Sequence, residues 1–137
     1  MLQKSIVVAG RFDHELTSMA LMELGHLALQ ENKYDVAGKF FLEASISAGV
    51  FEQYDVVEEA LNWGLKSHLA AGKKGLYAPL PLALQWSRTT SRMLEAGLYV
   101  AGAENYAVVG ETARATTMIQ SAQQAMRRRD MSRGDLS

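Results

Sequence analysis

Two helical patterns meet in MALMELGHLALQENKYDVAGKFFLEA, the stretch from Met19 to Ala44. Its second half places small or apolar residues three or four positions apart, the spacing that lines one face of an α-helix; these residues are Tyr34, Ala37, Phe41, Ala44 and Ala48. The first half is apolar nearly all round from Leu16 to Leu29, as expected of a helix with neighbours on several sides. A polar break of four residues joins the halves, so this stretch predicts an antiparallel helix hairpin.

The hairpin resembles the tetratricopeptide (TPR) repeat, a pair of helices about 34 residues long. The residues that carry the resemblance are Leu21, Leu24, Gly25, Ala28, Tyr34, Ala37, Phe41 and Ala44, with Leu21 in place of the family's Trp, Ala28 in place of its Tyr and Gly49 in place of its terminal Pro. Gly inside a helix costs about 1 kcal/mol relative to Ala, so Gly25 indicates close approach of a partner helix, which we expect at Ala37. The resemblance implies an all-α fold in which antiparallel helix hairpins stack as a short right-handed TPR-like solenoid.

Parts of the pattern recur along the chain. Ala9 and Ala48 are 39 residues apart, as are Gly25 and Gly64, and a looser third copy centres on Gly110. We call the first helix of each hairpin its front helix and the second its back helix. Three front helices are then expected, with the patterns Leu21, Leu24, Gly25, Ala28, then Ala60, Trp63, Gly64, Ser67, then Tyr106, Val109, Gly110, Ala113. Because a mid-helix Gly is costly, its recurrence favours a helical repeat.

These patterns predict a single TPR-like domain over residues 1–137. The expected hairpins lie at about 13–49, 53–97 and 101–130, built from helices at about 13–30, 34–48, 53–71, 79–95 and 101–130. Residues 2–8 are expected to form a partial helix and residues 131–137 a flexible tail. Each back helix is expected to end at an Ala-Gly pair, where Gly can adopt the left-handed conformation.

The composition limits the class of protein. An apolar fraction of 48% is typical of a globular chain with a core, and the absence of Cys excludes disulfides, thiol catalysis and thiolate metal sites. No apolar run reaches the length of a membrane span, so we expect a soluble, cytoplasmic protein without a membrane partner. Residues 1–70 hold five Lys or Arg and ten Asp or Glu, whereas residues 71–137 hold nine and five. Neither half is basic enough to indicate a nucleic-acid partner.

Few residues have a spacing that suggests chemistry. Glu23 and His26 form an E-x-x-H pair, but carboxylate-bridged metal bundles need two such pairs and the chain has one. No nucleophile motif or phosphate-binding loop is present. We therefore predict no enzyme, no cofactor and no metal. The alternative is a metal-binding helical bundle or enzyme, which would require Glu23, His26, His68 and Glu111 to converge.

The TPR resemblance implies instead a concave surface that binds a protein or peptide, in the manner of a scaffold or adaptor. The predicted groove residues are Met19, Met22, Glu23, His26, Leu61, Asn62, Leu65, His68, Glu111 and Arg114. Their largely apolar character favours an amphipathic helix or an extended apolar segment as the partner. Alternatively, the chain's own C-terminal helix covers them. Apolar residues at both ends of the pattern favour a homodimer or membership of a longer repeat array.

Overall fold

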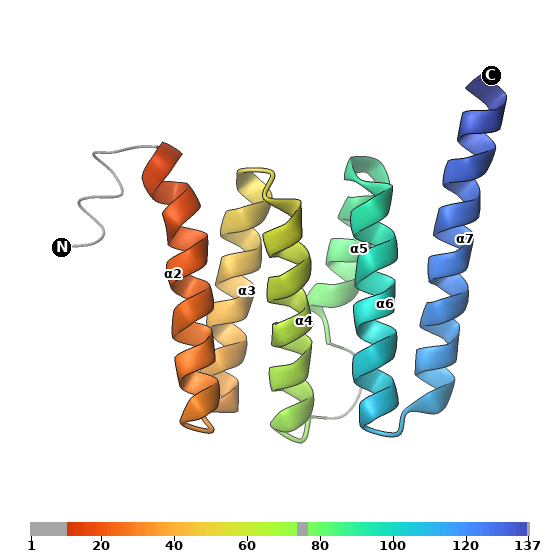
Figure 1. The fold of residues 1–137 in the computed structure, drawn as a ribbon. Helices are drawn as coiled ribbons and strands as arrows, with labels where there is room; N and C mark the ends of the chain where they lie inside the picture. Colours follow the sequence, from red (N-terminus) through yellow and green to blue (C-terminus); the bar gives the residue numbers. More distant parts are fainter. Residues whose placement is uncertain (1–10, 74–76, 137) are drawn as a thin grey trace. The chain divides into compact units, whose positions relative to one another are not determined.

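The computed structural model describes residues 11–73 and 77–136, and the side chains of residues 16–73 and 77–128. All regular structure in these residues is α-helical, which confirms the all-α class. The helices of Figure 1 are α2 (Arg11–Gln30), α3 (Tyr34–Val50), α4 (Tyr54–Ala70), α5 (Pro79–Thr90), α6 (Arg92–Val108) and α7 (Thr112–Leu136). The partial helix expected over residues 2–8 lies outside the described residues. Among those described, no helix has the length and apolar character needed to cross a membrane.

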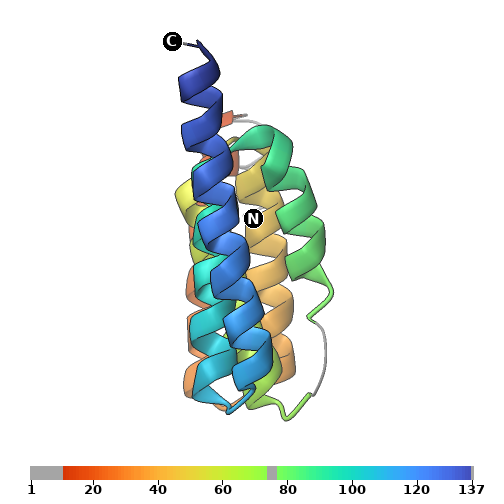
Figure 2. The same ribbon diagram turned by 90° about the vertical axis from the view of Figure 1, so that its right-hand side faces the viewer.

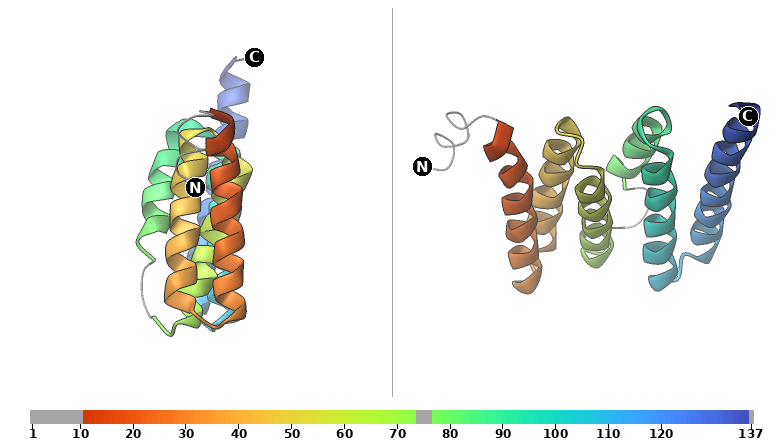
Figure 3. Two further views of the ribbon diagram at one scale, coloured as in Figure 1. Left: turned by 90° about the vertical axis from the view of Figure 1, so that its left-hand side faces the viewer. Right: turned by 45° about the horizontal axis from the view of Figure 1, so that its top comes forward.

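Contacts divide the chain into two compact units, which we call the N-terminal unit (Met1–Lys74) and the C-terminal unit (Gly75–Ser137). In the N-terminal unit, α2 and α3 run antiparallel side by side (Figures 1 and 3), and α4 packs against α3. Their shared core contains Met22, Ala28, Ala37, Phe41, Ala44 and Ala60, with Leu21, Leu29, Val56 and Trp63 packed around it. The expected helices over 13–30, 34–48 and 53–71 therefore form with nearly the predicted bounds.

Gly25 sets how closely α2 and α3 approach. A Cβ atom at Gly25 would lie 2.6–2.9 Å from three ring atoms of Phe41, which is closer than real Cβ contacts come. The ring of Phe41 thus occupies the space that any other residue at position 25 would fill. Close packing at Gly25 was expected, but its nearest neighbour is Phe41 and not Ala37.

The turns between helices use residues with positive φ. Asn32 (φ 60°) follows α2, Glu52 (φ 59°) follows α3 and Gly72 (φ 78°) follows α4. Gly110 (φ 84°) lies in the turn after α6, so its expected position inside a front helix is wrong. The pair Ala48-Gly49 lies within α3, and Glu52 takes the left-handed conformation in place of Gly49.

In the C-terminal unit, α6 packs against both α5 and α7. The helix expected over 79–95 ends at Thr90, because Ser91 is extended (φ −157°, ψ 115°) and its side chain accepts a hydrogen bond from the N–H of Leu94 at 3.2 Å. This cap starts α6, which passes through residues 96–101 without a break, so the boundary expected between 97 and 101 is wrong. The last helix begins at Thr112 instead of 101 and continues to Leu136 through the expected tail (Figure 2).

The same four helix positions are buried in α2, α4 and α6, with offsets of 39 and 38 residues. The equivalent sets are Ser18, Val57 and Glu95; Met22, Leu61 and Tyr99; Gly25, Gly64 and Gly102; Ala28, Ser67 and Asn105. The glycine of α6 that corresponds to Gly25 is therefore Gly102. A Cβ atom on Gly102 would collide with Met118 of α7, as one on Gly25 would collide with Phe41 of α3.

Candidate functional site

Three of the predicted groove residues of the N-terminal unit are buried. Met22 belongs to the core cluster around Phe41, and Leu61 and Leu65 of α4 are also buried. A buried side chain cannot meet a partner unless its surroundings open. The apolar strip expected from Met22, Leu61 and Leu65 is thus not an accessible surface in this structure.

Four of the predicted residues on the same two helices are accessible. Met19 and Glu23 are exposed on α2, and Asn62 and His68 are half-buried on α4. In Figure 1, α2 and α4 lie in front of α3. The accessible part of the predicted groove on the N-terminal unit is therefore mixed in polarity, with one large apolar side chain, Met19.

His26 is packed among aromatic rings. Its imidazole meets the rings of Phe41 and Trp63 edge to face, with centroid distances of 5.1 and 4.7 Å, and these two rings stack at 6.3 Å. The three rings come from α2, α3 and α4, so they join all three helices of the N-terminal unit. Aromatic pairs in this geometry contribute about 0.5–1.5 kcal/mol beyond their burial.

The E-x-x-H pair is therefore divided between two environments, with Glu23 exposed to solvent and His26 in the aromatic cluster. Over residues 16–73 and 77–128, no three side chains of the His, Asp and Glu types lie close enough together to hold a metal ion. No observation in the described residues favours the alternative of a metal-binding bundle or enzyme.

His68 lies near the C-terminal end of α4, where burial and the nearby ammonium of Lys73 lower the pKa of its imidazole. The Nζ of Lys73 forms an ion pair with Asp35 of α3 at 2.8 Å, and this pair lowers the pKa of the Asp35 carboxyl. The end of α4 is thus tied to the start of α3 by a surface ion pair. Because both of its side chains are more than half exposed, it contributes little to stability.

Glu111 and Arg114 belong to the C-terminal unit and not to a front helix. Glu111 lies in the turn before α7, where its N–H donates to the carbonyl of Tyr106 at 2.9 Å. Arg114 lies in the first turn of α7 with its guanidinium 5.4 Å from the centre of the Tyr106 ring, a cation–π contact. Both residues therefore help to close the turn between α6 and α7.

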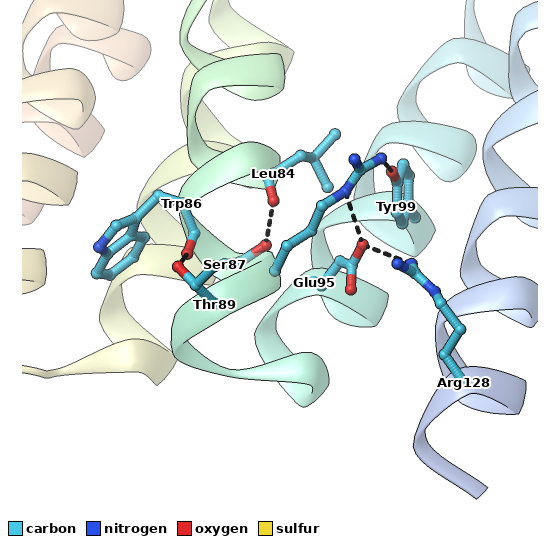
Figure 4. A network of polar contacts seen from close by, with 8 residues as sticks. Leu84, Trp86, Ser87, Thr89, Glu95, Tyr99 and Arg128 are labelled. Carbon is cyan, nitrogen blue, oxygen red and sulfur yellow. Dashed lines mark hydrogen bonds and ion pairs between the residues drawn. The ribbon is translucent and has the colours of Figure 1, made fainter. Parts of the chain in front are cut away.

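Glu95 of α6 is the centre of a polar network that the sequence reasoning missed (Figure 4). Its carboxylate is buried, and its Oε2 accepts from Arg128 at 2.9 Å and from Arg88 at 3.3 Å. Arg88 also donates to the hydroxyl of Tyr99 at 3.4 Å. The contact with Tyr99 and the charge of Glu95 raise the pKa of Arg88. One carboxylate thus joins α5, α6 and α7, each of which supplies one of the three charged groups.

Part of this network had a signal in the sequence. Arg88 and Glu95 are seven residues apart, which would place them on one face of a continuous helix, but the break at Ser91 puts them on different helices. Arg128 is 33 residues from Glu95 and has no local relation to it. Locating Glu95 would have required the correct boundary between α5 and α6.

Searches with this chain found no matching family model, no matching curated protein and no matching solved structure.

Proposed function

We propose that this chain is a TPR-like helical-repeat module, a short right-handed solenoid of hairpins, that acts as a scaffold for another protein and has no catalytic role. The observation that supports it is the recurrence of four buried positions in α2, α4 and α6, with Gly25, Gly64 and Gly102 at the same place in each. Repetition of a costly mid-helix Gly is a property of a repeat whose neighbouring helices must approach closely.

The proposed binding surface on the N-terminal unit is the accessible set Met19, Glu23, Asn62 and His68 on α2 and α4. Met19 supplies a large, adaptable apolar side chain, and the carboxylate of Glu23 and the amide of Asn62 are polar groups that could fix the register of a bound segment. A peptide or helix of a partner protein, with an apolar residue for Met19 and polar groups beside it, fits this surface.

Site-specific cross-linking in cells tests the proposal. A photo-reactive amino acid at Met19 should trap a specific partner, whereas the same amino acid at Ile46, an equally exposed apolar site on α3, should not. The trapped protein is then purified and titrated, and Met19→Glu should weaken its binding at least about tenfold, or about 1.4 kcal/mol. Equal trapping at both positions, or binding that Met19→Glu leaves unchanged, would contradict the proposed surface.

A further inference from the structure

The end of α5 is built differently from the ends of α2, α3, α4 and α6. Each of those four helices is followed by a residue with positive φ, and the N–H of the next residue donates to a carbonyl five positions earlier at 2.8 to 3.3 Å. These bonds run from Lys33 to Ala28, from Gln53 to Ala48, from Lys73 to His68 and from Glu111 to Tyr106. A left-handed residue closed by such a bond is a common way to terminate a helix.

Between α5 and α6, a single residue interrupts the helix. α5 ends one residue before Ser91 and α6 begins one residue after it, and Ser91 is extended with a negative φ of −157°. The N–H of Ser91 nevertheless donates to the carbonyl of Ser87 at 2.8 Å, and its own carbonyl accepts from the N–H of Glu95 at 3.0 Å, as in an unbroken α-helix. Residues 82–96 contain neither Gly nor Pro. The backbone conformation of Ser91 is therefore what separates α5 from α6.

A change of Ser91 to helical φ and ψ would join residues 79–108 into one helix about 45 Å long. The N–H groups of residues 92–94 would then donate to the carbonyls of residues 88–90. The bond given up in exchange is the one from the N–H of Leu94 to the hydroxyl of Ser91. Straightening this hinge therefore adds hydrogen bonds within the helix.

Straightening would also remove α5 from the face of α6 on which it packs. Leu80 of α5 is buried, and its Cδ2 lies 3.3 Å from the position of a Cβ atom on Gly102 of α6. Arg88 of α5 donates to Glu95 at 3.3 Å and to Tyr99 at 3.4 Å (Figure 4). In a continuous helix Leu80 and Gly102 would be about 33 Å apart along the axis. A single straightened chain therefore cannot keep the contacts between α5 and α6.

The helix that matches the vacated face of α6 is α5 of a second copy. Its Leu80 fits beside Gly102, and its Arg88 supplies a cation to the buried carboxylate of Glu95. Two straightened chains that exchange α5 remake the contacts between α5 and α6, and each chain also gains the hydrogen bonds of the straightened hinge. Exchange of an identical element is a low-cost route to a dimer.

We propose that this chain forms a two-fold dimer by exchanging α5 between copies, with Ser91 as the hinge. In the dimer, Arg88 of one chain pairs with Glu95 of the other, while Arg128 remains on Glu95 of its own chain. Glu95 thus keeps one cation while α5 is exchanged, which avoids a buried charge without a partner. The exchange does not involve Met19, so it is independent of the proposed binding surface.

Two substitutions at the hinge should act in opposite directions. Ser91→Ala removes the hydroxyl that caps α6 and introduces the strongest helix former, so it favours the straight form. Arg92→Pro favours the bent form, because Pro suits the first position of α6, keeps the preceding residue extended and disrupts a continuous helix. Each chain is refolded at about 100 µM and analysed by sedimentation equilibrium. Ser91→Ala should lower the Kd of the dimer at least about tenfold relative to the parent, and adding Arg92→Pro should return the chain to monomer.

Matched controls separate the hinge from the side chains that are replaced. Ser91→Ala with Arg92→Ala removes the same side chains as the Pro variant but keeps the N–H of residue 92, so it should remain dimeric. Ser47→Ala, a change of the same kind within α3, should leave the Kd of the parent unchanged. Circular dichroism checks that each variant keeps its helix content.

A distance within one chain distinguishes exchange from ordinary association. The chain has no Cys, so nitroxide labels can be attached specifically at Leu82→Cys in α5 and Glu104→Cys in α6, which are both exposed positions. Labelled chain is refolded with excess unlabelled chain, and double electron–electron resonance then reports the separation of the two labels of one chain. The bent monomer should give less than about 25 Å, since packed helices lie about 10 Å apart. The exchanged dimer of Ser91→Ala should give about 30 Å or more, because a helix rises about 1.5 Å per residue.

Three results would overturn the inference. The first is a strictly monomeric state of both the parent and Ser91→Ala at about 100 µM. The second is a dimer in which the labels stay at the shorter distance, which would mean that two bent chains associate through their surfaces. The third is a dimer that Arg92→Pro leaves intact. The distance measurement needs only Ser91→Ala, so it decides the question even if the Pro variant does not fold.

Discussion

The α2–α3 and α6–α7 hairpins each pack a glycine against a side chain 16 residues later in the chain, but the two side chains fill the space differently. Gly25 faces the flat ring of Phe41, which is held by His26 and Trp63. Gly102 faces the flexible end of Met118. A rigid filler locks the hairpin at one separation, whereas a thioether can adapt to its neighbours.

The contrast extends to the buried position that lies about two turns before the glycine in α2 and in α6. Ser18 of α2 makes a neutral hydrogen bond of 2.9 Å to Gln53, whereas its equivalent Glu95 is a carboxylate held by two Arg. The N-terminal unit is thus held by aromatic packing and the C-terminal unit by a charged network. Equivalent backbone positions do not require equivalent chemistry.

The two tryptophans allow each unit to be followed separately, since Trp63 lies in the N-terminal unit and Trp86 in the C-terminal unit. Variants with a single Trp, made by Trp86→Phe or Trp63→Phe, report the free energy of unfolding of one unit through its fluorescence.

The largest effect is expected when the buried carboxylate loses both partners. Arg88→Met with Arg128→Met keeps the apolar stems but leaves Glu95 buried without a cation, which should destabilise the C-terminal unit by about 3–5 kcal/mol. Urea unfolding followed by Trp86 measures this. Adding Glu95→Gln should restore most of the loss, and Arg127→Met, a matched control that does not contact Glu95, should change stability by less than about 0.5 kcal/mol. A double Arg variant as stable as the parent would show that the network does not hold the unit together.

The second-largest effect should distinguish the rigid ring of Phe41 from the flexible thioether of Met118. Gly25→Ala should destabilise the N-terminal unit by about 1–3 kcal/mol, because its Cβ would overlap the ring of Phe41. Gly102→Ala should stay within about 1 kcal/mol of the parent, because the end of Met118 can move and Ala favours the helix. Urea unfolding in the two single-Trp backgrounds gives both values. Equal losses would mean that Met118 is as constrained as Phe41.

A third glycine is the control for helix propensity alone. At Gly38 in α3 the nearest atom to an added Cβ is 3.9 Å away, which is an ordinary contact. Gly38→Ala should therefore stabilise the N-terminal unit by about 0.5–1 kcal/mol, measured as a higher urea midpoint with an unchanged slope. A loss of stability here would indicate that α3 and α4 are closer than described.

The smallest effect is a dependence on pH. Burial and Lys73 lower the pKa of His68 in the folded N-terminal unit. As the pH falls, the His68 imidazole is therefore protonated in the unfolded chain before it is protonated in the folded unit. The contribution of neutral His68 to the free energy of unfolding is therefore fully present above the ordinary pKa of 6.5 and is lost as the pH falls below that value. The Tm followed by Trp63 should drop between pH about 7.5 and 5.5, and His68→Gln should make this drop smaller. A drop of the same size in His68→Gln would assign it to other groups.

The sequence predicted the helices of the N-terminal unit well because local signals mark them. The stripe through Phe41 and the polar break before Tyr34 define α2 and α3 without reference to the rest of the chain. Gly25 was predicted to allow close packing, and it does, although against Phe41 and not Ala37. The predicted apolar strip of Met22, Leu61 and Leu65 is buried and not an open groove. Alignment to a front helix of the TPR family does not indicate which side of Leu61 is covered by neighbouring helices.

The third helix pair was misplaced because Gly110 was read as a mid-helix residue and Ala96-Gly97 as a helix end. The spacing of the glycines indicates the correct helix bounds. Gly64 and Gly72 are eight residues apart, as are Gly102 and Gly110, and the two pairs are 38 residues apart. In each pair the first glycine lies within a helix and the second in the following turn. The partner of Glu95 could not be predicted in this way, because the position of Arg128 depends on tertiary packing of α7.

The span of the Glu95 network in the sequence sets an order of events during synthesis of the chain. Arg88 precedes Glu95 by seven residues and is already made when Glu95 emerges, whereas Arg128 follows it by 33 residues. At a rate of synthesis of about 5–20 residues per second, Arg128 is made about 2–7 s after Glu95. The aromatic cluster of the N-terminal unit is complete once Trp63 has been made. A ribosome that pauses in the part of α7 before Arg128 would therefore carry a nascent chain that contains every residue of the aromatic cluster but lacks the second cation of Glu95.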